Sequence, residues 1–153
     1  MVLGTQTRLE ARRGDRIVNN HDISQRLISL AKEYYDELVR AYNRESWNVV
    51  VRHSQEVVEL CLKGLLKMMG VEYPKSHDVG NVFEIACNEM DIDISSDVLN
   101  RLKDISLDLA KKRSPAFYLE IIYTKKNAEK AKVDAEFVLD FTETLSQHLR
   151  TGH

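Results

Sequence analysis

The sequence predicts an all-α protein, folded as an up-and-down helical bundle of four main helices plus one short helix. Only six glycines and two prolines interrupt 153 residues, so helix breakers are sparse. Apolar residues recur at steps of three and four over long stretches, which is the period of an α-helix. The connections between these stretches are short, which favours antiparallel neighbours. The one stretch rich in strand-forming residues is FYLEIIY, residues 117–123.

The first two predicted helices are long. The first runs to Asn43 and has Asp22 as its N-cap. The second runs from Glu45 to Met69 and is the most apolar segment of the chain, so we expect it at the centre of the bundle. Gly70 follows it where a left-handed residue commonly ends a helix.

The third and fourth predicted helices flank a short polar turn. The third begins after Asp78, and Ser95 or Ser96 caps the fourth. The fourth ends near Arg113, two residues before Pro115, because the residue preceding a proline avoids the helical region. The inward face of the third helix is expected to hold Val82, Phe83, Ile85, Ala86 and Met90.

Thr124 is the predicted cap of the last helix, whose apolar stripe faces the bundle. We expect one domain over residues 21–150, since 153 residues suit a single core. Residues 1–20 have few large apolar side chains and predict a loosely ordered basic extension. Its four arginines are Arg8, Arg12, Arg13 and Arg16.

Composition and charge argue against several classes of protein. The net charge of −2 does not indicate a nucleic-acid-binding protein, and we expect no DNA partner. No apolar run reaches the roughly 18 residues of a membrane helix, and the N-terminus lacks the apolar core of a secretory signal. Cys61 and Cys87 are not paired like metal or redox cysteines, so we expect buried reduced thiols in a cytoplasmic protein, with a disulfide as the alternative.

The five histidines share no metal-ligand spacing, and the sequence predicts neither a metal nor a cofactor. It contains no glycine-rich phosphate loop and no nucleophile elbow. Polar residues on the second helix are mostly four or seven apart, which predicts a solvated stripe of ion pairs. These residues are Arg52, His53, Gln55, Glu56, Glu59, Lys63 and Lys67.

The insert EYPKSHDVG, residues 72–80, follows the most apolar helix. Pro74 stiffens this turn, and Asp78 is a predicted structural cap that accepts from the backbone N–H of Asn81 or its neighbour. Lys75 and His77 are not needed to close a turn. We regard both as candidates for binding a nucleotide or phosphate, with a hydrogen bond at the helix start as the alternative for His77.

A second candidate region begins at the end of the fourth helix, where Lys111, Lys112 and Arg113 precede Tyr118 and Tyr123. The cations favour the negative end of the helix dipole, which is a sufficient structural role. Cations beside phenols also suit contact with phosphates and bases. Arg113, Tyr118 and Tyr123 are therefore candidates for nucleotide or phosphate binding. The sequence assigns catalysis to no residue, and Arg113 and Tyr118 are the only ones to consider for it.

Three runs occur in order around the apolar helices: RHSQEVVELCLK at 52–63, PKSHD at 74–78 and YTKKNAEKA at 123–131. With these runs, residues 25–147 resemble the HEPN domain family (higher eukaryote and prokaryote nucleotide-binding). The resemblance implies a homodimeric helical bundle and a small prokaryotic protein encoded beside a minimal nucleotidyltransferase, often as the toxin of a toxin–antitoxin module. It also implies that active ribonuclease members carry an Arg, four to six residues and then a His, and cleave RNA without metal.

This sequence departs from the ribonuclease pattern, because Tyr118 stands where the His after Arg113 would be. A phenol, with an ordinary pKa of about 10, is a poor replacement for imidazole as a base near neutral pH. We therefore expect a non-catalytic subunit that pairs with a nucleotidyltransferase and binds nucleotide or RNA. The alternatives are a metal-independent endoribonuclease with a degenerate Arg-x4-Tyr site, helped by His77, and an adaptor bundle without a small-molecule site.

We expect a homodimer for two reasons. The second helix has an apolar face too wide for one neighbour, and the loop after the fourth helix carries Phe117, Tyr118 and Tyr123 on an expected exposed surface. The predicted interface buries this loop.

Overall fold

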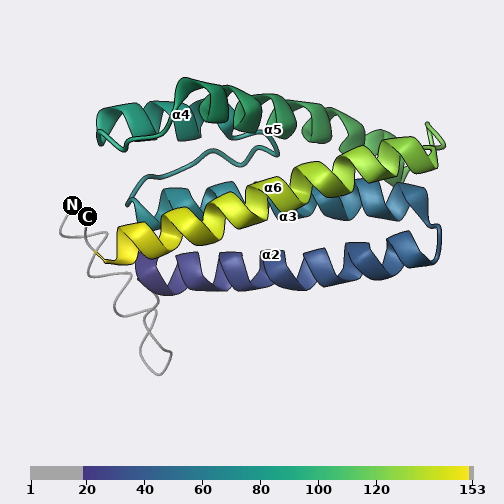
Figure 1. Cartoon of the computed structure of the whole chain (residues 1–153), viewed down its shortest axis with the longest axis horizontal. Coiled ribbons are helices and arrows are strands. Elements are labelled where there is room, and N and C mark those ends of the chain that lie inside the picture. Colours follow the sequence, from purple (N-terminus) through teal and green to yellow (C-terminus); the bar gives the residue numbers. More distant parts are fainter. Residues whose placement is uncertain (1–18, 152–153) are drawn as a thin grey trace, which may run out of the picture.

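The computed structural model describes residues 19–151, and within this range all regular structure is α-helical. Four long helices and one short one are present, which confirms the predicted fold class (Figure 1). The predicted extension over residues 1–20 lies almost wholly outside the described range. No helix within that range is long and apolar enough to cross a membrane. The helices are α2 (Asn20–Asn43), α3 (Trp47–Met68), α4 (Gly80–Glu89), α5 (Ser96–Phe117) and α6 (Lys125–Arg150).

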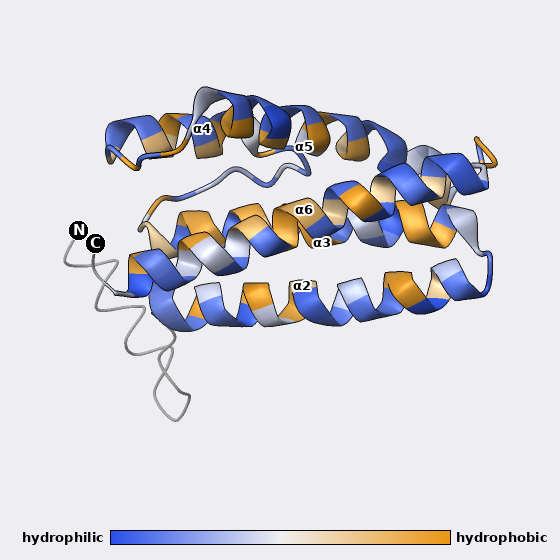
Figure 2. Ribbon diagram, in the orientation of Figure 1, coloured by the Kyte–Doolittle hydropathy of each residue, from blue (hydrophilic) through white to orange (hydrophobic). Residues whose placement is uncertain are grey.

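Helix α3 lies at the centre of the bundle, as predicted. It packs against α2, α5 and α6, while α4 lies with α5 in a separate layer above it (Figure 1). Apolar residues gather on the sides of the helices that face one another (Figure 2). The wide apolar face of α3 is thus covered within the chain, so its width is no argument for a dimer.

Side-chain caps fix the starts of three helices. Ser95 and Thr124 each accept a hydrogen bond at 3.2 Å from the backbone N–H three residues on, as predicted. The prediction for the first helix was wrong, because Asn19 is its N-cap and accepts at 2.9 Å from the backbone N–H of Asp22. Gly70 has the predicted left-handed backbone, with φ at 76°.

Helix α5 continues to Phe117, so the predicted end near Arg113 was wrong. Pro115 lies inside the helix and removes one backbone donor. A contact distant in sequence supports the last turn: Asn48 Nδ2 donates to the carbonyl oxygen of Ala116 at 3.1 Å. Asn48 also donates to the carbonyl of residue 121 at 2.8 Å and accepts from the N–H of residue 123 at 2.8 Å, which holds the loop after α5 in place.

The facing of the short helix α4 differs from the prediction in part. Phe83, Ala86 and Cys87 are buried, but Ile85 is 55% exposed and Met90 is 47% exposed. Each residue of a helix turns by about 100°, so Ile85, two places from Phe83, points to the opposite side. Met90 follows the last residue of α4 as its C-cap. Helix α4 packs mainly on α5 and therefore needs only one narrow apolar face.

Both cysteines are free thiols and both are buried. Burial raises the pKa of Cys61 to about 12 and that of Cys87 to about 11. The two thiols are therefore protonated at neutral pH and pack as small apolar side chains.

Candidate functional site

The connection between α3 and α4 runs back alongside α3 (Figure 1), where its side chains contact the polar stripe. Lys67 Nζ lies 3.2 Å from a carboxylate oxygen of Glu72, and Lys63 Nζ lies 5.2 Å from the centre of the Tyr73 ring. His77 then reaches the middle of α3. The predicted ion pairs of the stripe are present, for example that of Glu59 with Lys63, but its predicted solvation was wrong. The returning segment, α2 and α5 together leave none of its seven residues fully exposed.

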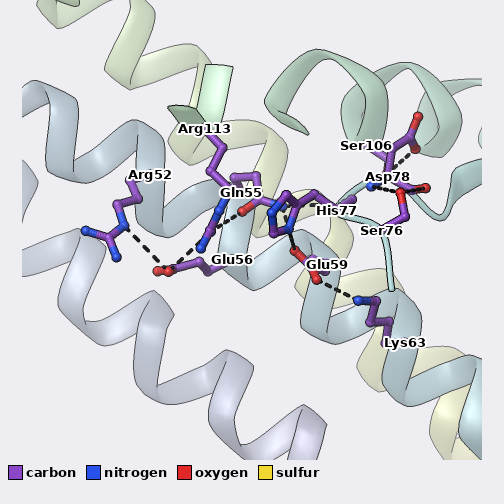
Figure 3. Close-up of polar contacts among 10 residues, drawn as sticks. All are labelled: Arg52, Gln55, Glu56, Glu59, Lys63, Ser76, His77, Asp78, Ser106 and Arg113. Carbon is purple, nitrogen blue, oxygen red and sulfur yellow. Dashed lines mark hydrogen bonds and ion pairs between the residues drawn. The ribbon is translucent and has the colours of Figure 1, made fainter. Parts of the chain in front are cut away.

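Gln55 joins three parts of the chain beneath this cover and is only 1% exposed. Its Oε1 accepts a hydrogen bond of 2.7 Å from Arg113 Nη1 on α5. Its Nε2 donates to Glu59 Oε1 at 2.9 Å and, at 3.5 Å, to the backbone carbonyl of His77. Gln55 therefore sets the position of Arg113 relative to α3 (Figure 3).

Glu56 is the carboxylate shared by two guanidinium groups. Its Oε2 lies 3.3 Å from Arg113 Nη1 and 3.7 Å from Arg52 Nε, and its Oε1 lies 2.7 Å from His53 Nδ1 (Figure 3 shows the two arginines). Burial raises the pKa of Glu56, but the hydrogen bond with His53 and the charges of His53, Arg113 and Arg52 outweigh it, so the pKa is lowered. Two permanent positive charges thus share one negative charge.

Glu59 holds the imidazole of His77. Its Oε1 lies 2.8 Å from His77 Nδ1, and its Oε2 accepts from Lys63 Nζ at 2.7 Å (Figure 3). Burial raises the pKa of Glu59, yet hydrogen bonds from Lys63, Gln55 and His77 outweigh it and lower the pKa. The side chain of His77 remains 55% exposed, so one side of its ring faces solvent.

The depressed pKa values of Glu56 and Glu59 predict a loss of stability in acid. The folded protein binds fewer protons at these groups than the unfolded chain, so their contribution is complete above the ordinary glutamate pKa of 4.5 and is lost as the pH falls below it. The free energy of unfolding, measured with urea, should decline as the pH falls from 7 to 3, and this decline should be shallower in Glu56→Gln. Glu89→Gln is the control, since Glu89 is exposed and has no ion-pair partner among residues 19–151. An unchanged pH dependence in Glu56→Gln would contradict the assignment.

A recess of about 270 Å³ opens beside this network, and we call it the aromatic recess. Its lining contains no carboxylate. The Arg52 guanidinium lies 4.4 Å from the centre of the Phe117 ring, and the Phe117 and Tyr118 rings meet edge to face at 4.8 Å. The lining residues are Arg52, His77, Arg113, Ser114, Phe117 and Tyr118.

Three of the residues singled out in the sequence, His77, Arg113 and Tyr118, line this one recess. The other two candidates do not line it. Lys75 is exposed and makes no polar contact with any described residue. Tyr123 is only 7% exposed, so the prediction that it is exposed was wrong. Its ring is buried in the loop that Asn48 holds in place, and little of it can contact a ligand.

Asp78 has a structural role that extends the predicted cap. Its Oδ1 accepts from the backbone N–H of Gly80 at 3.1 Å, at the first turn of α4. The same oxygen accepts from Ser106 Oγ of α5 at 2.7 Å (Figure 3). Asp78 therefore links α4 to α5 and orients the segment that carries His77.

Sequence reasoning missed the roles of Arg52, Gln55 and Phe117. A signal for Gln55 exists: it lies four residues after Val51 and three before Val58, both apolar, which places it toward the buried side of α3. Phe117 was assigned to a loop rather than to the last turn of α5. Within residues 19–151, no three His, Cys, Asp or Glu side chains are arranged to hold a metal ion.

The model of the HEPN domain family matches residues 24–145, which is most of the chain. The chain belongs to the HEPN domain family. The crystal structure of an archaeal HEPN homologue is similar, with a TM-score of 0.61 and 18% sequence identity over 80% of this chain and 96% of that chain. No curated protein matches the chain.

The family assignment confirms the predicted resemblance, and the structural likeness confirms the fold alone. Two of the three runs that suggested a HEPN domain contribute to the site. The run at 52–63 supplies Arg52, Gln55 and Glu56, and the run at 74–78 supplies His77. The run at 123–131 begins α6 and does not line the aromatic recess of this HEPN domain.

Proposed function

We propose that this HEPN domain is a non-catalytic binding subunit that holds a nucleotide or RNA phosphate in the aromatic recess. One observation carries the proposal: Arg52 and Arg113 share a single carboxylate at a recess with two aromatic rings. Arg52 Nε is buried beside Glu56, but the side chain is 37% exposed and its terminal nitrogens donate no hydrogen bond to any described residue, so these are the donors offered to a phosphate. Phe117 and Tyr118 offer surfaces for a base.

Arg113→Ala should weaken binding of AMP and of short RNA by roughly tenfold or more, because a charge-assisted hydrogen bond is lost. Binding by the unaltered protein should also fall as salt rises. Calorimetric titration at several salt concentrations measures both effects. Arg101→Ala is the control, since Arg101 is on the same helix but outside the recess. Equal loss in both variants, or no binding at any salt, would favour the adaptor without a small-molecule site.

A second candidate function is metal-independent RNA cleavage, and His77 is the observation that favours it. Its imidazole lines the same recess as Arg113 and Tyr118, although it comes from a different part of the chain than the family's ribonuclease His. An RNA digestion assay with a chelator separates the two candidates. Our proposal requires no cleavage above background; cleavage that is lost in both Arg113→Ala and His77→Ala would establish the ribonuclease.

We propose that the domain forms a homodimer through the loop after α5. The apolar side chains of Leu119, Ile121 and Ile122 lie outside the aromatic recess and are 64%, 48% and 78% exposed, and this surface suits a protein interface. Light scattering should therefore report a dimer at micromolar concentration. Ile122→Glu should be a monomer, because dimerisation would bury the new carboxylate. Val133→Glu is the control, because Val133 is 55% exposed on α6. A monomer at high micromolar concentration would contradict the proposal.

We further propose that the domain pairs in the cytoplasm with a separate nucleotidyltransferase, as one half of a toxin–antitoxin-like module. Membership of the HEPN family supports this pairing. Co-purification of the untagged protein from its native host, followed by mass spectrometry, tests it. If no nucleotidyltransferase is recovered with the protein, the proposed pairing is contradicted, whereas the proposed nucleotide binding is not affected.

A further inference from the structure

A second recess, which we call the apolar recess, lies on the other side of Arg113 and His77. Its volume is about 200 Å³, and Leu30, Tyr34 and Leu60 supply its apolar lining. Arg113 and His77 line both recesses, so the two recesses adjoin at these side chains, and we call the pair the groove. Each recess alone is smaller than the roughly 300 Å³ at which ligand pockets begin, whereas the groove as a whole exceeds it.

The two halves of the groove differ in charge. The aromatic recess has two guanidinium groups and no carboxylate in its lining. The apolar recess contains the carboxylates of Glu56 and Glu59, whose side chains are 14% and 16% exposed. Arg113 lines both recesses, but Arg52 lines only the aromatic recess and the two carboxylates line only the apolar recess. A phosphate at Arg113 is therefore favoured on the side of the aromatic recess, and the apolar recess suits an uncharged ring instead.

The apolar recess also offers a fixed aromatic surface. The Tyr34 ring stacks on His53 with centroids 5.4 Å apart, and His53 is held by Glu56. Leu30 and Leu60 provide apolar surface in the same lining. A base stacked here would be joined to a base in the aromatic recess through a phosphate near Arg113.

We infer that the groove binds a single strand of at least two nucleotides, with one base in each recess and the linking phosphate at Arg113. This inference rests on the proposed function and adds its substrate class: an oligonucleotide rather than a mononucleotide. It requires the dinucleotide ApA to bind at least about fivefold more tightly than AMP, the lower end of what one stacked base contributes. Charge alone favours AMP, which carries more negative charge than ApA.

The test is calorimetric titration of AMP and ApA against the full chain and against Leu30→Glu. Leu30 is 37% exposed, so a carboxylate is tolerated there while it fills the apolar recess. The variant should lose the advantage of ApA and keep its affinity for AMP within about twofold. If the new carboxylate acted only by charge repulsion, it would weaken the binding of AMP more than that of ApA, because AMP carries more negative charge. Leu107→Glu is the matched control, since Leu107 is 44% exposed and lines neither recess.

Equal affinity for AMP and ApA, or an unchanged advantage of ApA in Leu30→Glu, would overturn the inference and leave the phosphate site intact. Loss of the advantage in Leu107→Glu as well would also overturn it. Failure of both ligands to bind would overturn the proposed function itself. Titration of the corresponding deoxyribose dinucleotide shows whether the groove prefers an RNA or a DNA strand. Circular dichroism verifies that each variant is folded.

Discussion

Leu62→Ala and Leu65→Ala should each lower the free energy of unfolding by about 2–5 kcal/mol. Both side chains are 0% exposed and lie on α3, which contacts α2, α5 and α6. Truncation removes apolar contacts and leaves a cavity that three packed helices fill only in part. The effect is large because a domain of this size is stabilised by only about 5–15 kcal/mol in total.

Urea unfolding followed by circular dichroism measures this loss. Leu107→Ala is the matched control, because the same atoms are removed from a side chain that is 44% exposed on α5. The control should change stability by less than about 0.5 kcal/mol. If Leu62→Ala were as mild as Leu107→Ala, α3 would not be the centre of the core in solution.

Gln55→Met should cost about 3 kcal/mol, although the two side chains are similar in size. The substitution removes an acceptor of Arg113 and a donor to Glu59, so each of these partly buried charged groups keeps its other partners but loses one hydrogen bond. A hydrogen bond to a charged group contributes about 1.5–3 kcal/mol, and two are lost. Because Gln55 also sets the position of Arg113, we expect weaker AMP binding in the same variant.

Ser54→Ala is the control for this network, since Ser54 is the preceding residue and is 0% exposed. Its Oγ has no hydrogen-bond partner among the described residues, so its removal should be neutral or slightly stabilising. Chemical denaturation gives the stability of both variants, and AMP titration gives the binding. A neutral Gln55→Met with unchanged affinity for AMP would show that Gln55 does not hold Arg113.

The sequence predicted the helices well because their signals are local. The 3.6-residue period places Leu62 and Leu65 in the core whatever surrounds α3. Ser95 and Thr124 cap their helices through hydrogen bonds that span three residues, and Gly70 adopts its left-handed backbone without a distant contact. Interactions of such short range can be recognised in a single sequence.

The errors arose where a distant contact outweighed a local tendency. Pro115 predicts an early helix end, but Asn48 of α3 bonds the carbonyl of Ala116 and supports one more turn of α5. The same asparagine accepts from the backbone N–H of Tyr123 and so fixes a loop in which that side chain is buried. Nothing in the neighbourhood of either residue indicates these contacts.

The family, the helices and the presence of an unusual polar turn containing His77 follow from the order of residues alone. The folded chain was needed to show that this turn lies back over α3 and that Gln55 meets Arg113, 58 positions away. The physical reason is that helical periodicity fixes which side of a helix is polar, but not what covers it. In this chain the returning segment, α2 and α5 together provide the cover, and they convert a stripe of charged side chains into a partly buried network beside a groove.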